Sequence, residues 1–206
     1  EDSANLGNDA NGGTDLTEVN LAATDQATDT PTNNFCTMNP LDNYGASSTF
    51  SEGNNKIAIG TNDRTNTANM GLSAGKWYFE VKYTPGSQVY SMVGIVNYAA
   101  GSINSTTNGY LGIDAAGNWY YEIGGGGAST SNALRASANG SATNVSPYPV
   151  AGYASNQIAS GDIIQVAIDL DNNKIWWGKN NLGYWGIDGY NGVPNTNTNG
   201  YAIADP

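Results

Sequence analysis

The stretch that most limits how this chain can fold is residues 161–183, GDIIQVAIDLDNNKIWWGKNNLG. Its first half places apolar side chains at every second position, which is the pattern of a strand with one buried face. These apolar residues are Ile164, Val166, Ile168 and Leu170, with Gln165 and Asp169 on the other face. Residues 171–173 tolerate the positive φ angles of a tight turn, and residues 174–179 return as an aromatic strand. The segment therefore predicts a β-hairpin, with one indole of the Trp176 and Trp177 pair on each face.

Composition extends the strand prediction to the rest of the chain. The 206 residues include 27 glycines and 13 tyrosines but only 12% charged residues, and no apolar stripe repeats at helical spacing. We expect an all-β fold of antiparallel strands, with one main domain over residues 35–206. Further strands are predicted at residues 49–51, 56–60, 76–83, 90–97, 110–114 and 118–123, with residues 124–144 as a flexible loop or a frayed strand pair. The predicted core consists of Trp77, Phe79, Val81, Val93, Ile95, Ile164, Val166, Ile168 and Trp176.

The hairpin resembles the hallmark segment of SPRY domains, in which Gly-Asp opens an apolar strand and a Lys-Asn-Gly turn follows the return strand. The matching residues are Gly161, Asp162, Val166, Ala167, Asp169, Leu170, Asp171, Ile175, Trp176, Lys179 and Asn180. Asn181 stands where the family's turn usually has Gly. Residues 75–84 (GKWYFEVKYT) and 93–97 (VGIVN) resemble two further SPRY strands. The resemblance covers about residues 41–206, and it implies a two-sheet antiparallel β-sandwich of the concanavalin A type that lacks its last strands.

The acidic charge of the chain is concentrated in its N-terminal quarter. Nine of the 18 acidic residues precede Lys56, the first of seven basic residues, so the remainder carries a net charge of only −2. Because no basic patch is available to neutralise phosphates, nucleic acid is not an expected partner. Residues 1–34 hold too few apolar side chains to fold alone, and we expect an extended acidic arm, a linker or the tail of an upstream domain. Residues 16–22 (LTEVNLA) are predicted to be the last strand of that upstream domain.

The residue inventory removes most kinds of catalysis. The chain has no histidine and one cysteine, Cys36, which excludes histidine-dependent hydrolysis, an internal disulfide and a cysteine metal cluster. Glu80 and Glu122 are the best candidates for a pair of glycosidase carboxylates, although a solvent-facing or loop-anchoring role explains them more simply. No apolar run approaches the roughly 20 residues of a membrane span, so a membrane is not an expected partner. We expect a non-enzyme.

A calcium site is the other chemistry that the hairpin raises. Asp169, Asp171 and Asn173 repeat the first half of a calcium-binding loop, with oxygen ligands at alternate positions. Lys174 and Asn180 then stand where that loop needs glycine and glutamate. Because a hairpin turn explains the same residues, we expect no metal and no cofactor.

Aromatic side chains are the remaining candidates for binding. Sugars present apolar C–H faces that stack on aromatic rings, while neighbouring polar side chains fix the sugar hydroxyls. Strand alternation assigns about half of the aromatic residues to the core. The candidate binding residues are Tyr184, Trp185 and Tyr190, which lie in a predicted loop, together with Tyr120.

Residues 15–42 resemble the join between a laminin-G-like and a SPRY-like domain in marine phage structural proteins. This resemblance implies a virion or extracellular location, in a tail fibre or related appendage that presents loops to a host-surface glycan or protein. Other virion subunits or copies of this chain, in a homo-oligomer, are the expected partners, and residues beyond Pro206 are expected in the full product. Two alternatives stay open: a capsid decoration or self-assembling extracellular filament subunit, and a polysaccharide depolymerase.

Overall fold

The computed structural model describes a set of separate segments. These are residues 6–9, 11–20, 35–44, 48–59, 65–84, 91–96, 118–123, 133–138, 141–146, 160–181, 183, 185 and 192–203, and of residues 43–44, 91, 118–123, 133–138 and 141–146 the backbone alone. The chain divides into two compact units, Glu1–Met70 and Gly71–Pro206. No helix long and apolar enough to cross a membrane occurs in the described segments.

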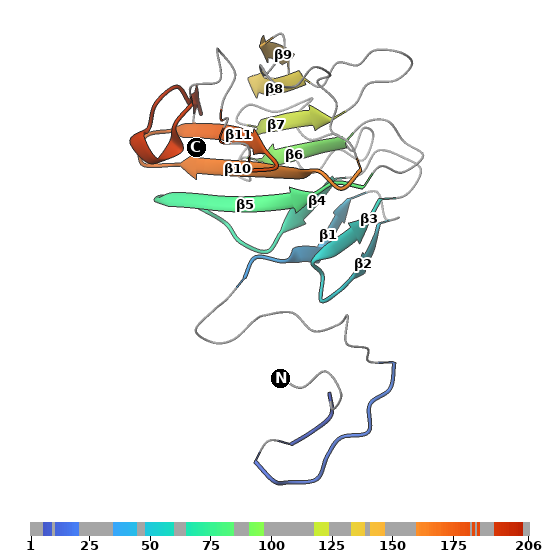
Figure 1. Ribbon diagram of the computed structural model, residues 1–206. Coiled ribbons are helices and arrows are strands. Elements are labelled where there is room, and N and C mark those ends of the chain that lie inside the picture. Colours follow the sequence, from blue (N-terminus) through green and yellow to red (C-terminus); the bar gives the residue numbers. More distant parts are fainter. Residues whose placement is uncertain are drawn as a thin grey trace. The chain divides into compact units, whose positions relative to one another are not determined.

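The first unit holds two pairs of antiparallel strands (Figure 1). Strand β1 (Met38–Tyr44) pairs with β4 (Thr65–Ala68), and its register shifts between Met38 and Asn43. Strands β2 (Thr49–Ser51) and β3 (Lys56–Ala58) form a short hairpin. Glu52, Gly53 and Asn54 all have positive φ angles in its turn, which glycine and asparagine adopt at low cost.

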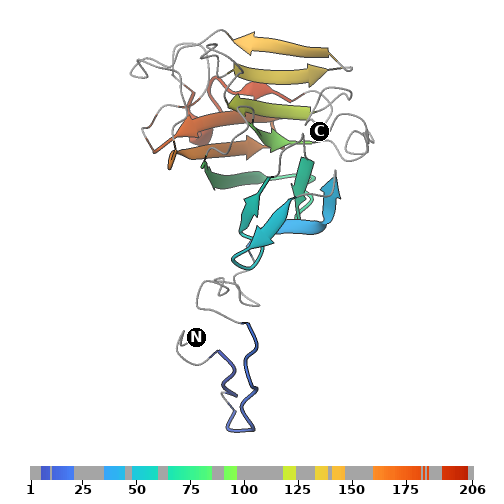
Figure 2. The same ribbon diagram turned by 90° about the vertical axis from the view of Figure 1, so that its right-hand side faces the viewer.

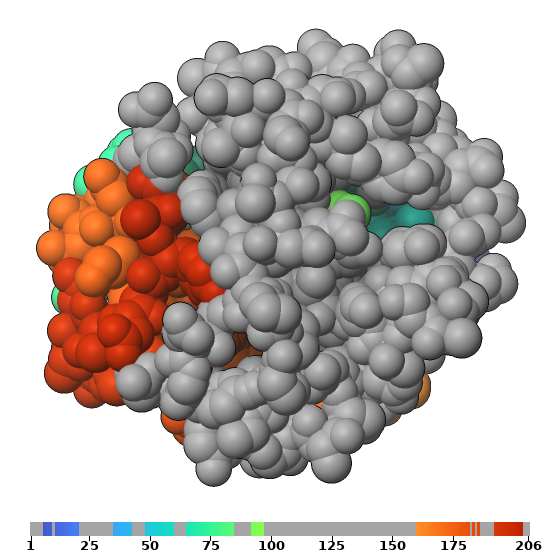
Figure 3. Space-filling view, turned by 90° about the horizontal axis from the view of Figure 1, so that it is seen from above, coloured from blue at the N-terminus to red at the C-terminus, as the bar shows by residue number. Residues whose placement is uncertain are grey.

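The second unit is organised around a four-stranded sheet in the order β12, β11, β10, β5. Strand β10 (Ile163–Asp169) lies between β5 (Lys76–Lys82) and β11 (Lys174–Lys179), as Figure 1 shows. Residues 192–200, which include the 3-10 helix η4 (Pro194–Thr196), lead into β12 (Tyr201–Ala202). Seen from above, orange and red atoms of residues 160–181 and 192–203 lie side by side at the left of the surface (Figure 3).

A second antiparallel sheet of this unit runs in the order β6, β7, β8, β9. Its strands are β6 (Ser91–Ile95), β7 (Asn118–Ile123), β8 (Ala133–Ala138) and β9 (Ser141–Ser146). Figure 2 shows these strands one above the other, with β9 at the top. Strands β8 and β9 lie in the region predicted to be a flexible loop or a frayed strand pair. They form an antiparallel hairpin with one irregularity of register.

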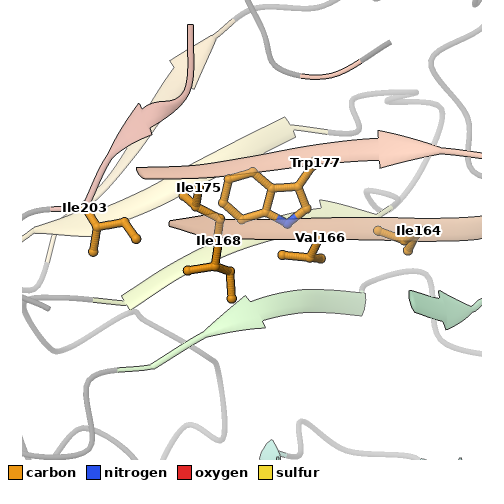
Figure 4. Close-up of a cluster of buried hydrophobic side chains, with 6 residues drawn as sticks. All are labelled: Ile164, Val166, Ile168, Ile175, Trp177 and Ile203. Carbon is orange, nitrogen blue, oxygen red and sulfur yellow. The ribbon is translucent and has the colours of Figure 1, made fainter. Parts of the chain in front are cut away.

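The hydrophobic core lies on one face of the sheet formed by β12, β11, β10 and β5, called the first sheet below (Figure 4). Its buried members are Ile164, Val166, Ile168, Ile175, Trp177 and Ile203. Val93 and Ile95 of β6 pack against this cluster, and the Trp177 Nε1 lies 3.4 Å from the carbonyl oxygen of Val93. The two sheets of the unit therefore meet at the cluster. Each fully buried aliphatic side chain there contributes about 1.5–3 kcal/mol to the hydrophobic stabilisation.

The predicted fold class is confirmed, because the described part of the chain is built from antiparallel strands without an α-helix. The face-to-face sandwich stays a prediction, since of β7, β8 and β9 only the backbone is described. The domain boundary expected at residue 35 also stays a prediction. The expected strand at residues 110–114 lies outside the described segments. Residues 16–20 form no strand, and residues 21–22 are not described.

Two of the predicted core residues are placed differently by the structure. Trp176 is 0% exposed, but it lies opposite Ala167 and shares that residue's face, so the neighbouring Trp177 occupies the core position beside Val166. Trp77 is 43% exposed although it lies opposite Ile168. Among the strands that the structure describes, β5 is the last in the sheet order and has β10 as its one neighbour.

Candidate functional site

Polar and aromatic side chains gather on the face of the first sheet that points away from the core. Tyr78 and Glu80 of β5 alternate with the core residue Phe79, and Gln165 of β10 pairs with both Glu80 and Gly178. Because successive side chains of a strand point to opposite faces, these residues share the face opposite Val166. The surface around Tyr78, Glu80, Gln165 and Trp185 is called the polar face below.

Trp185 reaches this face from the segment after β11 and lies over Gly178. A Cβ atom built on Gly178 would be 3.2 Å from the indole carbon Cε3, so the ring rests against the bare backbone of β11. The backbone of Trp185 forms isolated antiparallel bridges with Gly178 and with Gly192. Glycine at position 178 therefore leaves the space that the indole occupies.

The indole of Trp176 supports the segment that holds Trp185. Trp176 is fully buried and donates a hydrogen bond from Nε1 to the carbonyl oxygen of Thr198 at 2.9 Å. A Cβ on Gly192 would lie 3.0 Å from the Trp176 ring and 2.1 Å from the carbonyl oxygen of Trp185. The Gly192 N–H donates to that oxygen at 2.7 Å. Residues 192–200 thus pack directly on the Trp176 ring, and the backbone of Gly192 is hydrogen-bonded to that of Trp185.

A hydrogen-bond network fixes the polar side chains beneath the rings. Gln165 is 3% exposed, and its Oε1 accepts the backbone N–H of Asn181 at 2.8 Å, which sets the orientation of the amide. Its Nε2 then donates to the Tyr78 hydroxyl at 2.6 Å and to Glu80 Oε1 at 3.2 Å. The Tyr78 hydroxyl in turn donates to the same Glu80 oxygen. Within the described segments, Glu80 Oε2 receives no hydrogen bond.

Tyr78 is held in its protonated form. Partial desolvation of the hydroxyl, although the residue as a whole is exposed, raises its pKa above the ordinary value of 10.0, and the hydrogen bond to Glu80 raises it further, against a smaller opposite effect of Gln165. A phenol of this kind donates a hydrogen bond at neutral pH and is a poor nucleophile. The network is therefore suited to positioning Glu80 and the Tyr78 ring.

The rings of Tyr78 and Trp185 form an exposed aromatic corner. Their centroids lie 6.1 Å apart with an angle of 62° between the planes. Tyr78 is 53% exposed and Trp185 is partly exposed. Such an edge-to-face pair offers two apolar surfaces at a steep angle, with the carboxylate of Glu80 on the same sheet face.

Residues at the far end of the hairpin form a second cluster, which is structural. Lys179 Nζ lies 2.6 Å from Asp162 Oδ2, and Asn180 Nδ2 donates to Asp162 Oδ1 at 2.7 Å. Asn180 Oδ1 accepts the backbone N–H of Ile163 at 2.7 Å. Asn180 and Asn181 adopt φ angles of 50° and 54°. Asn181 therefore adopts the left-handed conformation that a glycine would take in this turn.

The possible calcium ligands instead close the turn between β10 and β11. Asp169 is 1% exposed, accepts hydrogen bonds from the backbone and side chain of Asn172, and pairs with Lys76 at 3.5 Å. Burial alone would raise the pKa of Asp169, but the bonds from Asn172 and the charge of Lys76 lower it overall. Asp171 accepts the backbone N–H of Gly75 at 2.8 Å. Across the described segments, no group of three acidic, cysteine or histidine residues is placed to hold a metal ion.

Trp185 is the one predicted binding residue whose side chain the structure describes, and it lies on the polar face. Tyr184 and Tyr190 lie outside the described segments. Tyr120 pairs through its backbone with Gly94 and Arg135, but its side chain is not described. The same holds for Glu122 in β7, so its pairing with Glu80 as a catalytic carboxylate stays untested.

Sequence reasoning missed Tyr78, Gln165 and Gly178 as members of the site. A signal for the first two was present, because Tyr78 and Gln165 alternate with apolar residues on two strong strands. The position of Gly178 beneath Trp185 depends on a contact between segments that no local pattern marks. Comparison with protein-family models and with curated proteins gives no match for this chain.

Proposed function

We propose that this chain is a non-catalytic adhesion module that binds glycans through its polar face. The observation that carries the proposal is the exposed corner of Tyr78 and Trp185 beside the Glu80 carboxylate, one oxygen of which accepts no hydrogen bond from the described part of the chain. Aromatic rings stack on the C–H faces of sugars, and Glu80 Oε2 can accept hydrogen bonds from ligand hydroxyls. The buried amide of Gln165 holds the acceptor in place before a ligand arrives, which reduces the entropic cost of binding.

A non-catalytic role is supported by the composition of the site. Glycoside hydrolysis ordinarily uses two carboxylates on opposite sides of the scissile bond. On the polar face as described, Glu80 is accompanied by an amide and by a tyrosine that stays protonated. The chain also has no histidine to act as an alternative base. Binding without bond cleavage is the activity that these groups fit.

The biological setting that we propose is a phage tail fibre or related virion appendage. It follows from the SPRY-like motifs and from the resemblance of residues 15–42 to a domain join in phage structural proteins. The contacts among Asp162, Lys179 and Asn180 give the Gly-Asp and Lys-Asn parts of the SPRY-like motif a shared structural role, which supports that resemblance. A fibre that repeats weak sites gains avidity through effective concentration, so each site needs only modest affinity.

The test compares two tryptophans on opposite faces of the same sheet. Purified chain is titrated with surface polysaccharide from candidate host bacteria, and Trp185→Ala is compared with Trp77→Ala as the matched control. We expect Trp185→Ala to weaken binding by about tenfold or more, since one aromatic contact is removed, and Trp77→Ala to change it by less than about twofold. Equal effects of both substitutions would contradict the site. A fall in polymer length during incubation would favour a depolymerase instead.

A further inference from the structure

We infer that the polar face selects glycans that carry a protonated amino group, that is, unacetylated amino sugars. This inference rests on the proposed glycan-binding function and specifies its ligand. It comes from a count of the hydrogen-bond donors and acceptors that the site leaves for a ligand. It also comes from the electrostatics of the aromatic corner.

The donors of the network are already engaged within the protein. The Gln165 Nε2 donates to both the Tyr78 hydroxyl and Glu80 Oε1, and because the residue is buried its amide offers no accessible donor to a ligand. The Tyr78 hydroxyl hydrogen is used on the same Glu80 oxygen. Of the four side chains that define the polar face, Trp185 alone keeps an N–H with no partner among the described residues. A ligand rich in acceptors, such as a uronate or sulfate, therefore finds a single neutral donor here.

The acceptors, in contrast, remain available and carry charge. Glu80 is exposed, and among the described residues its Oε2 has no hydrogen-bond partner while Oε1 accepts hydrogen bonds from two neutral groups. A ligand that donates hydrogen bonds is required, and an ammonium group donates three and carries the opposite charge. The faces of the Tyr78 and Trp185 rings add attraction for a cation, since each ring carries negative potential on its face.

Other charges on this sheet face have to be considered. Lys76 is two residues from Tyr78 on β5, but its ammonium pairs with Asp169 at 3.5 Å. Lys82 is two residues from Glu80 on the same face, and it forms no ion pair with Glu80 in the described segments. The interaction between two exposed charges that are not in direct contact is weak in the high dielectric of water. Lys82 therefore weakens the attraction for a cation slightly, and it serves as a control.

The test uses three oligosaccharides of equal length and identical β-1,4 linkage that differ only at carbon 2. Their units are glucosamine, N-acetylglucosamine and glucose, which present an ammonium, an amide and a hydroxyl. Calorimetric titration of the intact chain is expected to show the glucosamine oligomer binding about tenfold more tightly than the glucose oligomer, from one partly exposed cation–π contact and one charged hydrogen bond. The N-acetylated oligomer should bind no more tightly than the glucose oligomer. Added salt should weaken the glucosamine complex alone.

Two variants separate this inference from the proposed function. Glu80→Gln keeps an oxygen acceptor for Tyr78 but removes the charge, and it should reduce the preference for glucosamine to within about twofold. Lys82→Gln should leave the preference unchanged or slightly increase it. If all three oligomers bind equally and Trp185→Ala abolishes all three, the amino-sugar inference is wrong while the glycan site stands. If none of the three binds, and host polysaccharide does not bind either, both proposals are overturned.

Discussion

Gly200 lies so close to Trp176 that a Cβ atom built on it would be 2.3 Å from the indole carbon Cε2. The same indole donates to the carbonyl oxygen of Thr198, so residues 192–200 are folded over a single buried ring. Trp176, which we expected in the core, therefore packs against this segment instead. It lies under the segment that leads from the polar face to the last strand of the sheet.

Gly200→Ala should destabilise the fold. The added methyl group overlaps a rigid aromatic ring, and overpacking of this kind costs about 1–3 kcal/mol. The thermal unfolding midpoint should fall by several degrees. Gly71→Ala is the matched control, because a Cβ there meets nothing within 4 Å, and it should leave the midpoint nearly unchanged. An equal midpoint for both variants would contradict the packing of Gly200 on Trp176.

Gly178→Ala should weaken glycan binding with little loss of stability. Its Cβ would lie 3.2–3.3 Å from three carbons of the partly exposed Trp185 ring, which can shift outward by a few tenths of an ångström. That shift changes the corner with Tyr78, and we expect affinity to fall by about three- to tenfold, the effect of misplacing one aromatic contact. Titration and thermal unfolding of the same sample separate the two effects. A large drop in melting temperature without a change in affinity would oppose the role of Gly178.

Asp169 should make the stability of the protein depend on pH in the acid range. Its pKa is lowered in the folded state from the ordinary value of 3.8. The carboxylate therefore stabilises the fold at pH values above 3.8, and this contribution is lost as the pH falls through the lower folded-state pKa. Asp169→Asn should cost about 1–3 kcal/mol at neutral pH, because the buried bonds from Asn172 are disturbed. Urea unfolding of the variant between about pH 2 and 6 should show a shallower acid decline than the original chain.

The ion pair of Lys179 and Asp162 should contribute more than the exposed pair of Lys56 and Glu52. The first pair joins side chains that are 16% and 14% exposed at 2.6 Å, while the second joins side chains that are 62% and 46% exposed at 3.0 Å. A double-mutant cycle should give a coupling of about 1–3 kcal/mol for the first pair, as expected for a largely desolvated charged hydrogen bond. The exposed pair should give less than about 1 kcal/mol. Similar couplings would show that burial of the hairpin end has little effect.

The strands that the sequence predicts well are those whose alternation is local. Residues 163–169 and 76–82 carry their pattern within the strand, and both are found with nearly the expected bounds. Strand β1 contains Pro40 and several polar residues, and its pairing with β4 depends on a long-range contact. Alternation alone also could not decide which of Trp176 and Trp177 faces the core. That choice depends on the register of the hairpin, in which Val166 lies opposite Trp177 and Ala167 opposite Trp176.

In the candidate site, too, features encoded locally could be predicted and features that depend on long-range contacts could not. Trp185 could be predicted as a binding residue because it is aromatic and lies in a loop. Its position over the sheet could not, since it depends on contacts with Gly178 of β11 and with Gly192, which itself packs on the buried Trp176 ring. The orientation of Gln165 likewise depends on the backbone N–H of Asn181, sixteen residues further on.

The alternation of β5 and β10 places interior and surface residues next to each other along the chain. Phe79 and Val166 pack in the interior. Tyr78, Glu80 and Gln165, which alternate with them, lie on the outer face. A substitution at Glu80 changes the outer chemistry without altering the volume of the interior. Single substitutions on the outer face can therefore alter the ligand recognition that we propose, while the packing beneath them stays the same.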